Sequence, residues 1–154
     1  MNGAHRVAYV GLLAASVAAC ESPLSPSELG ALARAQGRWA ARSFQDYAFE
    51  IRRSCFCEPA VTSWVRVEVV SGGVSRVVFV DSGREVPPAE RARYPTVEQV
   101  FSRIRTGSDD EWVDDVTVEF DGQLGFPIRV TFRPKSGILD AGETIFLRNV
   151  GPIT

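Results

Sequence analysis

Residues 65–80 read VRVEVVSGGVSRVVFV, which is the pattern of a β-hairpin. Val65, Val67 and Val69 alternate with charged residues, so one side of the first strand is apolar and the other is polar. Ser71-Gly72-Gly73 supplies a turn, and residues 74–80 are apolar enough to return beside the first strand. The centre of this chain is therefore expected to be β-sheet.

Segments with strand character lie on both sides of this hairpin. On its amino-terminal side, Tyr47, Phe49 and Ile51 alternate with Ala48, Glu50 and Arg52, and the pattern extends towards residue 57. Three more strands are expected on its carboxyl-terminal side, at residues 116–120, 128–132 and 144–150. Short connections between successive strands favour antiparallel pairing.

Two helices are expected outside the strands. The first spans residues 26–46, where Ser25 and Glu28 form a capping box around a proline and apolar residues recur at helical spacing. The second begins at Thr96 with a T-x-x-Q capping box and ends at Gly107, after a proline-containing loop over residues 81–95. The order of elements predicts one α+β domain over residues 27–154, with about six antiparallel strands and both helices on one face.

Residues 1–19 have the pattern of a bacterial signal peptide. A polar start with one clear positive charge precedes an apolar run over residues 7–19, which is too short to remain as a membrane-spanning helix. Val17-Ala18-Ala19-Cys20 resembles the lipobox of bacterial lipoproteins, in which the cysteine is lipidated and becomes the first residue. An ordinary signal peptide that ends near a cysteine is the alternative.

The lipobox resemblance implies an extracytoplasmic, lipid-anchored protein of the bacterial envelope. Residues 20–26 would then be the lipidated Cys20 and a short tether, which places the domain close to the membrane because six residues reach at most about 20 Å. Glu21 follows the cysteine where Asp usually signals retention in the inner membrane. The outer membrane is therefore favoured in an organism with two membranes.

The composition narrows the chemistry of the domain. The chain has 154 residues, a net charge of −2 and a single histidine, which is His5 and leaves with the signal peptide. Neither a Ser-His-Asp nor a Cys-His nucleophile can then form, and a nucleic-acid binder that relies on bulk positive charge is excluded. No catalytic residue, cofactor or metal site is predicted, although hydrolysis by a carboxylate pair stays open.

The acidic run over residues 109–115 is interpreted as a solvated loop, with calcium binding as the alternative.

Cys55-Phe56-Cys57 is the one chemical feature that stands out. If the strand continued through residue 57, both cysteines would share the face of Tyr47 and Phe49, with Cα atoms about 6.6 Å apart. That separation is at the upper edge for a disulfide, so a bond would require a bend, and Arg53 on this otherwise apolar face hints at one. An oxidising compartment favours a structural disulfide. Two buried free thiols, a redox pair and a soft-metal site are the alternatives.

Other side chains have ordinary interpretations. The arginines around the second helix indicate an exposed helix face, and a basic surface that docks an anionic partner or lipid headgroup is the alternative. These are Arg91, Arg93, Arg103 and Arg105. The three tryptophans, Trp39, Trp64 and Trp112, are expected in or at the edge of the core.

The chain resembles a bacterial envelope family catalogued as domain of unknown function 6174. The segment from Arg53 to Cys57, preceded by Trp39 and Tyr47, carries the most specific part of this resemblance. Further matching pieces are Val86-Pro87-Pro88, Tyr94 to Phe101, Phe120-Asp121 and Gly125-Phe126-Pro127. Phe120 and Phe126 depart from the pattern, where tyrosine is more usual. The family implies a secreted or lipid-anchored domain and assigns no activity or catalytic residue.

Together these patterns predict a lipid-anchored, extracytoplasmic domain that acts as a non-catalytic binding or envelope-associated module. Its expected partners are the membrane, through Cys20, and an envelope protein, with no nucleic acid. The alternative is a thiol-redox or soft-metal protein that uses Cys55 and Cys57.

Overall fold

The computed structural model of the protein describes residues 24–107, 111–138 and 140–153. The predicted signal peptide, Cys20 and most of the tether lie outside the described residues, as do Asp109 and Asp110 of the acidic run. Within the described ranges, no helix is both long enough and apolar enough to cross a membrane.

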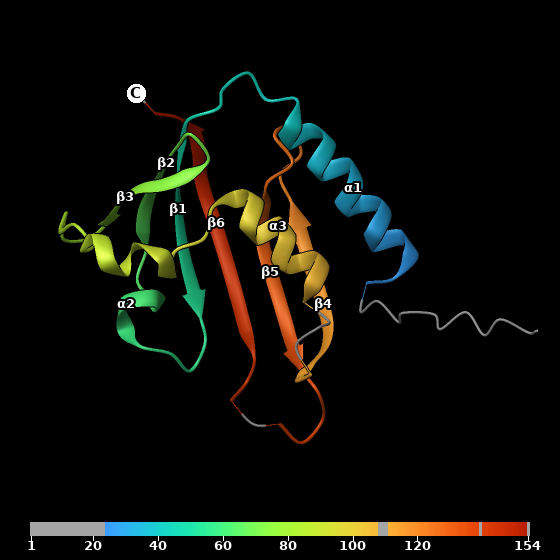
Figure 1. Ribbon diagram of the computed structural model, residues 1–154. Helices are drawn as coiled ribbons and strands as arrows, with labels where there is room; N and C mark the ends of the chain where they lie inside the picture. The colour runs from blue at the N-terminus through green and yellow to red at the C-terminus, as the bar shows by residue number, and fades with distance from the viewer. Residues whose placement is uncertain (1–23, 108–110, 139, 154) are drawn as a thin grey trace, which may run out of the picture.

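Six strands form a single antiparallel sheet in the order β3-β2-β1-β6-β5-β4. The strands are β1 (Tyr47–Ser54), β2 (Val65–Val70), β3 (Gly73–Phe79), β4 (Val113–Phe120), β5 (Pro127–Pro134) and β6 (Glu143–Pro152). The helical elements are α1 (Pro26–Ala40), α2 (Pro59–Thr62), the 3-10 helix η1 (Pro88–Arg93) and α3 (Val97–Thr106). Figure 1 shows α1 and α3 lying across the same face of the sheet. The predicted α+β class is therefore confirmed.

The hairpin that the sequence predicts is formed by β2 and β3. Ser71 and Gly72 both have positive φ, at 51° and 76°, as a two-residue turn requires if it is to match the twist of the strands. Val65 and Val67 face the helices and are buried, while Arg66 and Glu68 lie on the opposite face. The hairpin pairs with β1 through β2.

The core lies between the sheet and the two long helices. Its largest fully buried side chains come mainly from the inward-facing positions of the strands, together with Ile104 of α3. They include Tyr47, Phe49, Ile51, Phe132, Ile145 and Leu147. Because β6 pairs with both β1 and β5, the last strand of the chain joins the two halves of the sheet.

The predicted extent of the first helix is wrong at its carboxyl end, because α1 ends at Ala40 and not near Asp46. The Arg42 side chain folds back and donates a 2.8 Å hydrogen bond to the Trp39 carbonyl. The last carbonyls of a helix have no partner within the helix, and this bond provides one for Trp39. Phe44 and Tyr47 still contact Trp39, with ring centroids 6.3 and 5.1 Å away. Their helical spacing thus reflects a shared neighbour and not a continuous helix.

Glu98 of α3 links the amino-terminal helix to the sheet. Its carboxylate accepts hydrogen bonds from Trp39 Nε1 at 2.8 Å and from the Tyr47 hydroxyl at 2.5 Å, and it pairs with Arg42 at 3.0 Å. Burial raises the pKa of the Tyr47 hydroxyl, and the adjacent Glu98 carboxylate raises it further. The hydroxyl therefore stays protonated and holds α3 in place, since it also accepts from the Val97 amide.

Candidate functional site

A pocket of about 290 Å³ lies where β1, β6, η1 and α3 meet. Three arginines from three different elements line it: Arg53 at the end of β1, Arg93 at the end of η1, and Arg103 in α3. The remaining walls are Ala92, Pro95, Gln99 and Ile145. We call this hollow the arginine pocket.

Two other hollows are larger but less distinctive. One, of about 390 Å³, lies between the β2–β3 turn and η1 and contains a single arginine, Arg91. Another, of about 410 Å³, lies beside α2, where Arg84 and Asp81 carry opposite charges. Neither brings together several like charges, so the arginine pocket is the candidate site.

Helix α3 positions one wall of the arginine pocket. Thr96 caps its start, and the side chain of Gln99 accepts a 2.8 Å hydrogen bond from the Thr96 amide in return. The predicted capping box is thus confirmed. The apolar face of α3 packs on the sheet, and the guanidinium of Arg103 lies 4.6 Å from the centroid of the Phe132 ring. The helix therefore holds Gln99 and Arg103 at the pocket.

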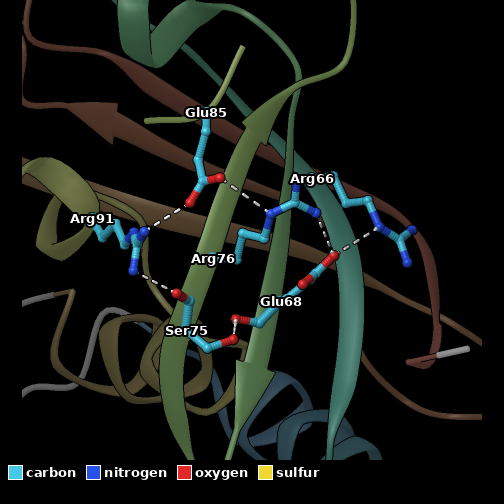
Figure 2. Close-up of polar contacts among 6 residues, drawn as sticks. All are labelled: Arg66, Glu68, Ser75, Arg76, Glu85 and Arg91. Atoms are coloured by element: carbon cyan, nitrogen blue, oxygen red, sulfur yellow. Dashed lines mark hydrogen bonds and ion pairs between the residues drawn. The ribbon is translucent and has the colours of Figure 1, made fainter. Parts of the chain in front are cut away.

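A chain of alternating charges holds η1 against the hairpin (Figure 2). Arg91 donates to the Ser75 carbonyl at 2.6 Å and pairs with Glu85 at 2.8 Å. Arg76 lies 3.4 Å from both Glu85 and Glu68, which continues the chain across β3 onto β2. Individual exposed ion pairs stabilise little, but this network fixes the segment that ends in Arg93.

Glu143, at the start of β6, joins two arginines of the pocket. Its side chain is 6% exposed and accepts hydrogen bonds from Arg53 Nε and Arg103 Nη2, one on each carboxylate oxygen. Burial alone would raise the pKa of Glu143, but the bonds from Arg53 and Arg103 outweigh it and hold the pKa below its usual value. The carboxylate is therefore ionised at neutral pH and fixes the orientation of both guanidiniums.

We expect the Glu143 pairs to make stability depend on acid pH. A depressed folded-state pKa stabilises the protein above the unfolded value of 4.5, and that contribution is lost as pH falls through the folded value. Glu143→Gln should lower the free energy of unfolding by about 1–3 kcal/mol at pH 7, and the difference from the native chain should shrink towards pH 3.

Urea denaturation across this pH range measures the effect. Glu119→Gln is the matched control, since it removes a carboxylate that is exposed and is in no ion pair within the described part of the chain. A Glu143 difference that stays constant from pH 7 to pH 3 would contradict the expectation.

Arg93 is held more loosely than the other two arginines. It pairs with Glu58 at 3.0 Å, where the arginine side chain is 48% exposed and the glutamate side chain is 70% exposed. Exposed pairs of this kind contribute about 0–1 kcal/mol. Glu58 is therefore a partner that another anion can displace.

Cys55 and Cys57 lie between Arg53 and Glu58. Their sulfur atoms are joined in a disulfide, and their Cα atoms are 5.2 Å apart. Strand β1 ends at Ser54, so the chain bends before the cysteines and brings their Cα atoms closer than a continuous strand would. The cysteines consequently do not extend the Tyr47 face. Phe56, enclosed by the bond, is 89% exposed.

The structure divides the predicted basic helix face into separate environments. Arg93 and Arg103 line the arginine pocket, whereas Arg91 belongs to the hairpin network and Arg105 donates to Gln36 at 2.9 Å. Arg53 completes the pocket from β1; its place on an apolar face was the signal for it in the sequence. Glu143 gives no local signal, because its partners are 90 and 40 residues away in the chain.

The remaining candidates lie away from the pocket. Trp39 is buried in the core as predicted, while Trp112 packs against the core only in part. Trp64 is partly buried, and Arg148 stacks over its ring at 3.9 Å. In the described ranges no group of three or more histidine, cysteine, aspartate or glutamate side chains is placed to hold a metal ion.

Comparison with known proteins identifies the family of the chain. No curated protein and no solved structure matches the chain significantly. Residues 31–152 match the model of a family described as a family of unknown function, DUF6174. The match spans Trp39, Arg53, the cysteine pair and the arginine pocket, and thus most of the described domain. The chain therefore belongs to the DUF6174 family.

Proposed function

We propose that the protein is a lipid-anchored domain of the bacterial cell envelope that binds a ligand in the arginine pocket. The pocket itself carries this proposal. It is close to the lower size limit of small-molecule sites and combines apolar walls with a few converging polar groups. A guanidinium has five N–H donors and no acceptor, so these groups suit the binding of an anion.

The sequence at residues 17–20 supports the anchor. Val17-Ala18-Ala19-Cys20 carries the aliphatic residue, the two small residues and the cysteine in the order that lipidation requires. Helix α1 begins at Pro26, six residues after Cys20, so the chain between them spans at most about 20 Å. An anchored domain would thus meet its ligand at or near the membrane surface, where its second proposed partner is an envelope protein.

Site-specific photocrosslinking in native envelopes tests the binding role. A photoreactive residue at Ala92, which lines the pocket, should give a defined adduct. Ala92 also borders the hollow of about 390 Å³, so the same residue at Val74, which lines that hollow and not the arginine pocket, should give none. The same residue at Ala89, exposed on the same 3-10 helix but outside the pocket lining, is the matched control. Adducts of equal yield at both positions, or none at Ala92, would contradict a ligand site in the pocket.

A second candidate function is thiol-redox or soft-metal chemistry at Cys55 and Cys57. The observation in its favour is that the bonded pair lies outside the regular strand, with Cys57 exposed. Reduction by a dithiol would convert the disulfide to two thiols and oxidise the dithiol to its own disulfide. Thiol alkylation and mass spectrometry across a redox series separate the candidates: a bond that stays closed in strongly reducing buffer excludes the redox role.

A further inference from the structure

The donors left over in the arginine pocket indicate what it can bind. A guanidinium has five N–H donors. In the described part of the chain, Glu143 engages one nitrogen of Arg53 and one of Arg103. The other donors of these two side chains remain for a ligand, while the buried carboxylate keeps both groups in place. Because these side chains are already oriented, ligand binding costs less conformational entropy.

The charges in the pocket do not balance without a ligand. Arg53, Arg93 and Arg103 contribute three positive charges, and the buried Glu143 cancels one of them. Glu58 cancels a second only while its exposed pair with Arg93 is closed. When that pair opens, the pocket presents a surplus of two positive charges.

We propose that the arginine pocket binds a phosphate monoester, with its phosphoryl oxygens accepting hydrogen bonds from Arg53, Arg93 and Arg103. A phosphate monoester carries a charge of about −1.5 to −2 at pH 7 and three strong acceptor oxygens, which match the surplus charge and the three arginine side chains. A single carboxylate would neutralise only half of that surplus. This inference rests on the proposed binding function of the same pocket and names its ligand class.

Glu58 acts as a built-in competitor in this site. With no ligand it pairs with Arg93, and the ligand takes its place. The Cys55–Cys57 disulfide and α2 flank Glu58 in the chain, so they keep this carboxylate near the pocket. Removing the competitor should therefore strengthen binding, whereas removing any of the three arginines should weaken it. If these charges only stabilised the fold, removing Glu58 and removing an arginine would not change ligand affinity in opposite directions.

Phosphorus NMR and calorimetry on the full chain in detergent test the proposal. The probes are inorganic phosphate, glycerol 3-phosphate and dihexanoyl phosphatidic acid, whose short chains keep it soluble. Saturable binding of one probe per protein is expected. Equal affinity for the last two probes indicates a soluble ester as the source, while tighter binding of the lipid indicates a membrane headgroup.

The variants make the test specific. Arg93→Gln should weaken binding by at least about tenfold, as should Arg103→Gln. Arg105→Gln, two residues further along the same helix and bonded to Gln36 outside the pocket, should stay within about twofold of the native chain. Glu58→Gln should strengthen binding by about two- to fivefold, and Glu119→Gln, with the same charge change elsewhere, should have no effect. Arg93→Gln removes only an exposed pair, so it should fold normally.

Three results would each overturn the proposal. Absence of saturable binding of all three probes, equal losses in Arg93→Gln and Arg105→Gln, or weaker binding by Glu58→Gln would each exclude it. These outcomes leave the anchor untouched, because acylation of Cys20 is measured separately. Loss of phosphate binding with a retained crosslink at Ala92 would refute the ligand class while leaving the pocket as a binding site.

Discussion

Cys20→Ala is expected to abolish acylation of the protein completely. The proposed anchor depends on this one sulfur atom, and each buried methylene of an acyl chain contributes about 0.8 kcal/mol to membrane binding. One chain binds only marginally, so a lipidated cysteine with two or three chains is needed for stable anchoring. In cells given a labelled fatty acid, the native chain should carry the label and the variant should show only background.

Mass spectrometry of the amino terminus completes this experiment. The native protein should begin at Cys20 with the added mass of its acyl groups, whereas the variant should have neither that start nor that mass. A Cys55→Ser, Cys57→Ser double variant is the matched control, because it removes the other two cysteines and should keep the label. Labelling that persists in Cys20→Ala would refute the anchor.

Gly125→Ala is expected to be the most destabilising small substitution in the fold. Gly125 has φ of +81°, and a Cβ placed there would lie 2.3 Å from the Ala35 carbonyl oxygen and 2.9 Å from Arg38 Cβ. The close neighbours include helix backbone, which cannot rotate away as a flexible side chain can. Strain and overpacking together predict a loss of about 2–5 kcal/mol in the free energy of unfolding.

Urea denaturation of Gly125→Ala and Gly122→Ala makes the comparison. Gly122 lies in the same β4–β5 connection and does not have a positive φ, and a Cβ placed there would meet nothing within 4 Å. Its substitution should therefore change the free energy of unfolding by less than about 1 kcal/mol. Equal losses at the two positions would show that the contact between this connection and α1 does not limit stability.

Local patterns in the sequence were enough to predict most of the elements. The alternation around Val67 and the turn at Gly72 predicted the hairpin, because a strand with one buried face repeats every two residues. The capping boxes at Ser25 and Thr96 predicted the starts of both long helices, since the unpaired amides of a first helical turn need acceptors, which the cap side chain just before the helix supplies. The end of the first helix could not be predicted in this way. Phe44 and Tyr47 lie outside the helix but pack against Trp39, so their spacing resembles that of helical residues.

The candidate site could be predicted only in fragments. Arg53 stood out as a charge on an apolar strand face, and the spacing of the cysteines suggested a bend just after it. The sequence places Arg93 and Arg103 on one basic helix surface with Arg91 and Arg105, which lie outside the pocket in the structure. Glu143 gave no signal at all, although its carboxylate orients two of the three arginines.

The fold class, the hairpin, the helix starts and the candidate disulfide can all be inferred from the sequence, because they follow from patterns among residues close together in the chain. Three features require the assembled fold: β6 pairs with β1, Gly125 packs against α1, and three distant arginines share one pocket. Those features depend on how distant strands pair and how the helices pack on the sheet around a common core. Charge and burial at the pocket then follow from the fold, since a buried carboxylate needs partners that only the assembled strands and α3 provide.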